Sequence, residues 1–214
     1  MKKALLCLLL LVLGCLMVIS YASADRLILI PTGSTISTGI KGEYAASAEG
    51  DDQKIYWASI GMSRFEIEGA RFQDFPATEK TDALSAQVCV IPETSFTPAV
   101  AVGVRDISDE TEGLGLPYDG QSFYAAVSKT VPITGGVPVI FQDMKVHGGV
   151  GTGSLGGVFF GVEGTLPIGL RIAAEYDTEE FNWAAIYSVA GPLKFKVSSI
   201  RNDLYYGAFL STSF

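Results

Sequence analysis

The sequence is poor in cysteine and histidine. Cys7 and Cys15 lie in the N-terminal apolar run, so Cys89 is the one cysteine left in the rest of the chain. A lone cysteine excludes an intramolecular disulfide, and backbone pairing and packing must stabilise the fold. His147 is the single histidine, and no serine sits in a nucleophile elbow. We therefore expect no enzyme and no catalytic residues, with His147 a strand residue near the rim of the fold.

Basic residues are also scarce. The chain has 15 Lys and Arg against 23 Asp and Glu, a formal charge of −8, which becomes −10 without Lys2 and Lys3. An acidic chain of this kind lacks the basic surface that nucleic acids require, so nucleic acid is excluded as a partner. The acidic clusters lack the Asp-x-Asp-x-Asp-Gly spacing of a calcium loop, so neither a metal site nor a cofactor is expected. These clusters are Asp51-Asp52, Asp109-Glu110 with Glu112, and Glu179-Glu180. Solvated loop charge is the default interpretation, and divalent bridging to lipopolysaccharide phosphates is the alternative.

Only one apolar run is long. It extends from Ala4 to Ile19 after Lys2 and Lys3, and Ala22-Ser23-Ala24 follows. This pattern predicts a signal peptide over residues 1–24, cleaved before Asp25. The run is shorter than the roughly 20 residues of a spanning helix, so a retained anchor is the weaker alternative. Val12-Leu13-Gly14-Cys15 also resembles a lipobox, in which case Cys15 would be lipidated. With no other such run, a membrane location would require a closed barrel.

From residue 35 onwards, hydrophobicity alternates with a period of two. The clearest case is Leu193-Lys-Phe-Lys-Val-Ser, in which Leu193, Phe195 and Val197 share one face. Such alternation predicts strands with one wet and one apolar face. Most of the segments exceed the roughly 5–6 residues of soluble strands and approach the roughly 9–11 that cross a bilayer. They cover about 35–47, 54–62, 64–72, 84–92, 97–106, 121–130, 144–153, 157–166, 169–177, 180–189, 193–201 and 203–213.

These segments predict an all-β fold, an antiparallel transmembrane β-barrel of about 12 strands (10–12) over residues 35–214. Residues 25–34 would form an N-terminal periplasmic segment. Long acidic outward loops are expected near 48–53, 73–83 and 107–120, and mostly short turns on the other side, as in outer-membrane barrels. The long 131–143 connection departs from this pattern, so the strand count would change by two if it is misassigned. A soluble β-sandwich or lipocalin-like barrel, with its apolar face inside, is the alternative.

The C-terminal segment is typical of outer-membrane barrels. Leu204, Tyr206, Ala208, Leu210, Thr212 and the terminal Phe214 share one face of the last strand. A final strand ending in an aromatic residue resembles the signal read by the barrel-assembly machinery, which is therefore an expected partner beside outer-membrane lipid. We assign this signal to Tyr206, Leu210 and Phe214. Aromatic girdles are expected at the strand ends, from Tyr56, Trp57, Phe159, Phe160, Tyr176, Phe181, Trp183, Tyr205 and Tyr206.

If the apolar faces meet lipid, a set of charged residues faces the lumen. These are Arg64, Glu66, Glu68, Arg105, Arg171, Glu175, Lys194 and Lys196. Mixed charges in a confined space would pair into ladders that close and stabilise the barrel. The same residues would otherwise line a pore or a sugar-binding cleft. Gly151-Thr-Gly153-Ser-Leu-Gly156 matches the dinucleotide-binding spelling, but a strand follows it, so turn glycines are the better interpretation.

Several blocks of the sequence resemble the YjbH-type family of outer-membrane proteins. The resemblance rests on the Leu84–Ile107 stretch with its Gly103-Val-Arg-Asp106 block, on Phe123–Lys129, and on Phe159–Asp177 with its Glu175-Tyr-Asp177 block. It spans about residues 60–190, although this chain is shorter than the larger members of the family. The resemblance implies a barrel and, more weakly, a role in exopolysaccharide export or attachment with polysaccharide as a partner. The alternatives are a passive small-solute channel and a closed structural or adhesive barrel.

Overall fold

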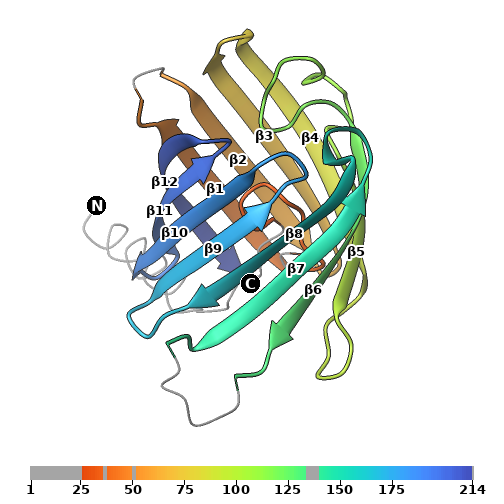
Figure 1. Cartoon of the computed structure of the whole chain (residues 1–214), viewed down its shortest axis with the longest axis vertical. Helices are drawn as coiled ribbons and strands as arrows, with labels where there is room; N and C mark the ends of the chain where they lie inside the picture. Colours follow the sequence, from red (N-terminus) through yellow and green to blue (C-terminus); the bar gives the residue numbers. More distant parts are fainter. Residues whose placement is uncertain (1–25, 36–37, 50–51, 134–139, 214) are drawn as a thin grey trace, which may run out of the picture.

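The computed structural model describes residues 26–35, 38–49, 52–133 and 140–213. In these residues twelve antiparallel strands form one closed barrel (Figure 1). The strands are β1 (Thr38–Ser47), β2 (Lys54–Met62), β3 (Phe65–Phe75), β4 (Thr78–Ile91), β5 (Ala99–Arg105), β6 (Ser122–Val131), β7 (Asp143–Gly151), β8 (Gly157–Thr165), β9 (Leu170–Tyr176), β10 (Phe181–Ala190), β11 (Leu193–Ile200) and β12 (Asp203–Ser213). The prediction of an all-β antiparallel barrel of about twelve strands is confirmed. Within the described residues, no helix is long and apolar enough to cross a membrane.

Each strand pairs with the next in sequence, and β12 closes the ring by pairing with β1. The closing pair runs from Gly39 opposite Ser213 to Ser47 opposite Tyr205. Full closure leaves no unpaired sheet edge, which is the condition for a sheet to be stable in lipid. The strand bounds lie within three residues of the predicted segments, except that β4 starts at Thr78 and not near residue 84.

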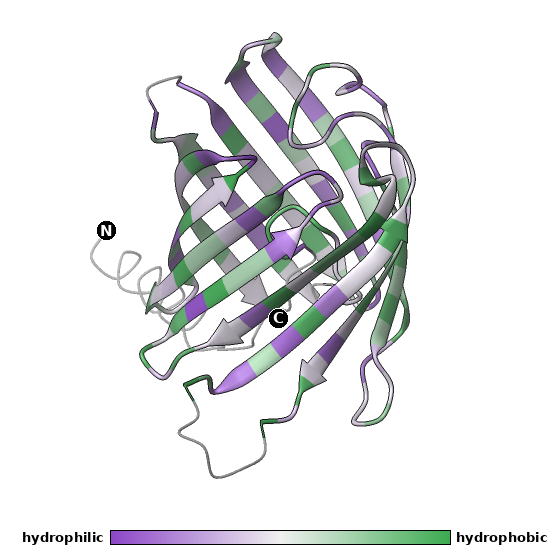
Figure 2. Ribbon diagram, viewed as in Figure 1, coloured by the Kyte–Doolittle hydropathy of each residue, from purple (hydrophilic) through white to green (hydrophobic). Residues whose placement is uncertain are grey.

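Hydrophilic and hydrophobic residues alternate along many of the strands (Figure 2), and the exposure of their side chains assigns them to the two faces of the wall. On β11, Phe195 is exposed on the outside, whereas Lys196 and Ser198 are buried inside. On β10, Trp183 and Tyr187 are likewise outside, and Asn182 is buried. The exposed outer face is therefore rich in large apolar side chains, and many buried inward positions are polar. This arrangement is the reverse of a soluble barrel, in which the apolar face fills the interior.

The two ends of the barrel differ. The terminal end, where β1 begins and β12 ends, carries the connections 63–64, 92–98, 166–169 and 191–192. The opposite, loop end carries the long 106–121 connection and the tight β11–β12 turn. Arg201 and Asn202 in that turn both have positive φ, 50° and 70°, as a two-residue type I′ hairpin requires.

The prediction of an outward loop at 73–83 is wrong. β3 continues to Phe75 and β4 starts at Thr78, so these residues extend a hairpin beyond the rest of the wall. The Arg71 guanidinium pairs across the hairpin with the Asp82 carboxylate at 2.6 Å. Both faces of the hairpin carry polar residues here, so the sequence lacks the apolar alternation that marks a strand. Backbone pairing maintains the ladder without it.

Candidate functional site

The most informative site is the lumen, because residues 26–35 lie inside it. We call this segment the lumen plug. Its Leu27 N–H donates to the Ile30 carbonyl at 3.0 Å, and Arg26 and Pro31 face each other across the resulting turn. Ile28, Leu29 and Ile30 have no solvent exposure. The segment expected on the periplasmic side is thus packed within the ring of strands, because its apolar side chains are buried there.

Glu175 on β9 holds the plug by its backbone. Its carboxylate accepts the N–H groups of Ile28 at 2.8 Å and Leu29 at 2.7 Å, and the Asn182 side-chain amide at 3.2 Å. A turn exposes N–H groups that no strand can pair, and successive N–H groups of this kind form an anion-binding concavity. Glu175 is itself 2% exposed. One wall carboxylate thus satisfies the buried donors of the plug.

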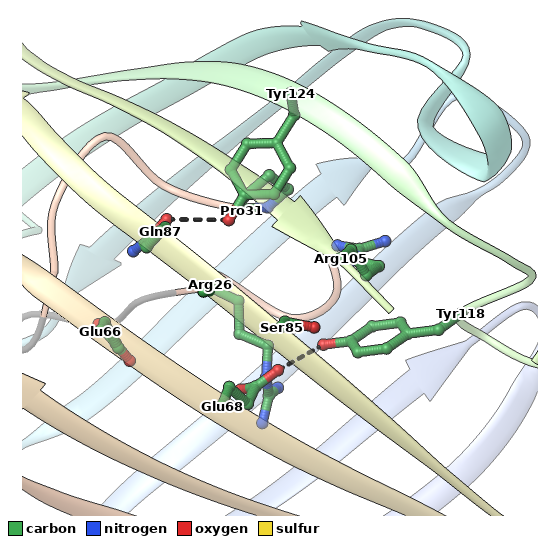
Figure 3. Close-up of a pocket in the computed structure, with 10 residues that line it drawn as sticks. Arg26, Pro31, Glu66, Glu68, Ser85, Gln87, Arg105, Tyr118 and Tyr124 are labelled. Carbon is green, nitrogen blue, oxygen red and sulfur yellow. Dashed lines mark hydrogen bonds and ion pairs between the residues drawn. The ribbon is translucent and has the colours of Figure 1, made fainter. Parts of the chain in front are cut away.

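Arg26 binds the plug to the opposite wall (Figure 3). Its guanidinium contacts the Glu43 carboxylate at 2.9 Å and the Glu68 carboxylate at 2.8 Å, and it lies 4.0 Å from the centroid of the Trp57 ring. Lys196 reaches the second oxygen of Glu43 at 2.7 Å. These groups are all nearly excluded from solvent, so each charge depends on its partner. The predicted mixed-charge pairing is found here, but its centre is a plug residue.

The loop end is closed by the 106–121 connection. Leu116 and Tyr118 are 0% and 1% exposed. The Tyr118 hydroxyl donates to Glu68 at 2.9 Å, and the Arg105 guanidinium lies 4.2 Å from the Tyr118 ring centroid while donating to the Leu29 carbonyl. The loop is therefore joined to the plug through the same buried network. Its burial follows from the apolar Leu116 and the aromatic Tyr118.

A second chain of contacts holds the far part of the plug. The Gly33 N–H donates to Ser128 Oγ at 2.8 Å, and Ser128 Oγ lies 2.8 Å from His147 Nδ1. His147 Nε2 lies 3.5 Å from Glu163, which pairs with Arg171 at 3.1 Å. His147 is therefore a buried lumen residue rather than a rim residue.

Ser128, His147 and Glu163 form a row of contacting side chains with the residue types of a hydrolase triad. Ser128 has no exposure, however, and its oxygen already accepts the plug N–H. A nucleophile must meet a substrate at this oxygen. Gly33 lies so close that a Cβ there would be 2.5 Å from the Ala99 carbonyl and 2.6 Å from the Ser128 nitrogen. The arrangement functions here as an anchor for the plug.

Two small interior cavities flank the plug. One has a volume of about 30 Å³ and is lined by Arg26, Pro31, Glu68, Gln87, Arg105 and Tyr118, among others (Figure 3). In this cavity Tyr124 lies across Gly103 and donates to Gln87 at 3.2 Å, a contact that requires a residue without a side chain at position 103. The other, of about 20 Å³, lies among Lys41, Glu43, Arg171, Lys194, Lys196 and Phe209. Each has room for one or two water molecules, so neither would pass a solute.

The predicted lumen residues fall into three groups. Glu66, Glu68, Arg105, Glu175 and Lys196 are buried in the lumen. Arg171 and Lys194 line the smaller cavity toward the terminal end. Arg64 does not face the lumen, because it lies exposed in the tight connection between β2 and β3. The structure thus brings seven of these charges around the plug and places the eighth outside.

The residues predicted for the C-terminal assembly signal and for the aromatic girdles lie partly on the outer face and partly in the lumen. Tyr206 and Leu210 point outward, each 54% exposed, whereas Phe214 lies outside the described residues. Among the aromatics expected in the girdles, Trp57, Phe159 and Tyr205 are buried in the lumen. The others lie outside, and Phe160, Tyr176 and Phe181 pack together with ring centroids 5.1–6.3 Å apart. Inward aromatics fill the lumen where polar side chains would leave space.

Outside the strands, Glu93 fixes the 92–98 connection at the terminal end. It accepts the Thr130 N–H at 2.6 Å and lies 3.6 Å and 3.7 Å from the ammonium groups of Lys129 and Lys145. Partial burial raises the pKa of Glu93, but the Thr130 hydrogen bonds and the two lysines outweigh it and hold the pKa below its usual value. The carboxylate therefore stays charged and keeps this connection closed against the wall.

Sequence reasoning did not identify the plug or its partners Glu43, Trp57 and Tyr118. Arg26 followed by Leu-Ile-Leu-Ile is the one available signal, since a charged and strongly apolar segment is unsuited to an exposed linker. Comparison with protein-family models and with curated proteins finds no match to this chain. Its function must therefore be argued from the geometry.

Proposed function

We propose that this protein is an outer-membrane β-barrel that its own N-terminal segment holds closed at rest. Its outer face supports a membrane location. Large apolar side chains cover the outside of the wall, including Ile60, Ile67, Val102 and Val162, each at least 38% exposed. Water would make such a surface costly, whereas lipid favours it. Closure of the sheet leaves no strand edge to face the hydrocarbon.

The lumen plug is the observation that carries the proposal. A passive channel needs a continuous polar path, and this lumen is occupied by residues 26–35 from one end and by the 106–121 connection from the other. Both are bound by buried hydrogen bonds and ion pairs. A closed barrel with a structural or adhesive role in the envelope is therefore favoured over a small-solute channel, and no enzymatic activity is proposed.

A role in exopolysaccharide attachment or export rests on the resemblance of the Gly103–Asp106 and Glu175–Asp177 blocks alone. In the structure these residues support the plug and the loop end: Arg105 donates to the plug, and Asp106 accepts the Thr111 N–H at 2.9 Å. Polysaccharide binding is accordingly a separate proposal. It would be tested with whole cells that do or do not display the barrel, by measuring their retention of the labelled polymer.

The primary test is fractionation followed by gel mobility of boiled and unboiled samples. We expect the protein in the outer-membrane fraction, with a mobility shift on boiling that is typical of closed membrane barrels. Recovery as a soluble protein without a shift would overturn the membrane proposal. A folded, inserted wild type that conducts ions steadily would overturn the closed state alone.

A further inference from the structure

The smaller interior cavity is lined mainly by cationic side chains. It is bordered by Arg26, Lys41, Arg171, Lys194 and Lys196, and Glu43 is the one carboxylate among the described residues of its lining. Lys41, Arg171 and Lys194 come from the first halves of odd-numbered strands, and Ser211 comes from the end of β12. All four positions therefore lie toward the terminal end. We call this site the basic vestibule.

Lys194 is the member of the vestibule that forms no ion pair with a described residue. The carboxylates near the vestibule bind other cations: Glu43 is 2.7 Å from Lys196, Glu68 is 2.8 Å from Arg26, and Glu163 is 3.1 Å from Arg171. Among the described residues, no carboxylate lies within 4.0 Å of Lys194. Its ammonium lies instead 5.1 Å from the centroid of the Phe209 ring, and Lys41 lies 5.7 Å from the same centroid. Lys41 also lies 3.7 Å from the Glu43 carboxylate. For Lys194 the aromatic ring is a weak compensation for its charge.

We propose that the basic vestibule binds an oxyanion, a carboxylate or phosphate group that enters from the terminal end. Ammonium and guanidinium groups recognise these groups by charge-assisted hydrogen bonds, which Arg171 and Lys194 can supply together. The Arg171 side chain is 23% exposed, so the vestibule is reachable from solvent without release of the plug. Ser211 adds a hydroxyl at the same wall. The cavity of about 20 Å³ admits one oxygen of the ligand, and the rest of the ligand would extend toward the mouth.

This inference goes beyond the proposed function, since it depends on the folded barrel and not on where the barrel resides. The test uses the purified full-length protein, folded in a non-ionic detergent. The temperature of the heat-dependent mobility shift is measured with inorganic phosphate, with a trimer of galacturonic acid, and with neutral maltotriose, all at constant ionic strength. A ligand that binds only the folded state raises this temperature in a concentration-dependent manner.

We expect stabilisation by phosphate or by the acidic trimer and none by maltotriose. Tighter binding of the trimer than of phosphate would identify an acidic saccharide as the source of the oxyanion. Tighter binding of phosphate would identify a free ion as the source. Lys194→Gln should weaken the apparent affinity by about tenfold or more, because it removes one charged donor. Lys194→Arg should retain binding. Lys80→Gln, on the exposed part of β4, is the matched control and should behave as the wild type.

Absence of stabilisation of the wild type by both anions would overturn the proposal, and this measurement needs no variant. Equal stabilisation of Lys194→Gln and the wild type would also overturn it, since the anion would then bind elsewhere. Neither result would affect the membrane location or the closed lumen. Those are decided by fractionation and by conductance.

Discussion

Replacing Glu175 by leucine should release the lumen plug while leaving the barrel intact. In the wild type the carboxylate accepts the Ile28 and Leu29 N–H groups at 2.8 Å and 2.7 Å. Leucine has a similar volume but accepts no hydrogen bond, so both donors would be buried without partners. Each such donor costs roughly 1–3 kcal/mol, which gives roughly 2–6 kcal/mol against the plugged state.

That energy corresponds to a change of roughly 30-fold to 10⁴-fold in the equilibrium between the plugged and the open lumen. The wall should survive because the backbone of Glu175 pairs with Gly161 on β8 and Asn182 on β10, and the substitution does not alter these pairs. Heat modifiability should therefore persist. Glu175→Gln keeps one carbonyl oxygen as an acceptor and should have a smaller effect.

The assay is ion conductance in planar bilayers, at equal amounts of heat-modifiable protein. We expect frequent openings for Glu175→Leu, fewer for Glu175→Gln, and wild-type behaviour for the control Glu79→Leu on the exposed part of β4. A folded, inserted Glu175→Leu barrel that is as silent as the wild type would refute the role assigned to Glu175.

Two further substitutions and one labelling experiment test separate parts of the account. Arg26→Ala leaves Glu43 and Glu68 without their shared cation, so the folded barrel should lose roughly 3–5 kcal/mol, measured by urea titration of the mobility shift; an unchanged midpoint would contradict the buried network. Gly33→Val places side-chain atoms against the Ala99 carbonyl, so it should increase conductance as Glu175→Leu does, and a silent folded variant would count against the close approach. Cys89, 6% exposed with its thiol directed to the Ile91 carbonyl at 3.2 Å, should react with a water-soluble maleimide only after unfolding. Fast labelling of the folded, heat-modifiable protein would contradict the burial of Cys89 inside the barrel.

The strand order and the two faces of the wall were predictable from the sequence. In Leu193–Ser198 apolar and polar residues alternate at every position, which shows which face is apolar. In Phe181–Ser188 the large aromatic residues Phe181, Trp183 and Tyr187 share one face. Closure then follows, because twelve antiparallel strands with an apolar outer face leave no stable open form in lipid. The extended β3–β4 hairpin was missed because polar residues lie on both of its faces beyond Phe72, with Phe75 as the one large apolar residue of β3 there.

The lumen network was not predictable in the same way. Its contacts join residues that are far apart in sequence, such as Ile28 with Glu175 and Glu43 with Lys196, separated by 147 and 153 positions. Alternation shows that Glu43 or Lys196 points inward but not which charge it meets across the lumen. The inward Trp57 and Tyr205 were assigned to the girdles because residue type alone does not distinguish an aromatic that fills a lumen from one that meets the membrane interface.

The two tryptophans allow the most direct test of the central claim. Trp183 lies on the outer face at 46% exposure, and Trp57 lies in the lumen at 3% exposure beneath Arg26. In vesicles of lipids brominated on their acyl chains, the fluorescence of Trp57→Phe, which retains Trp183, should be strongly quenched. The fluorescence of Trp183→Phe, which retains Trp57, should be nearly unaffected. Quenching of Trp57 but not of Trp183, or quenching of neither, would contradict a membrane barrel with an apolar outer face and a filled lumen.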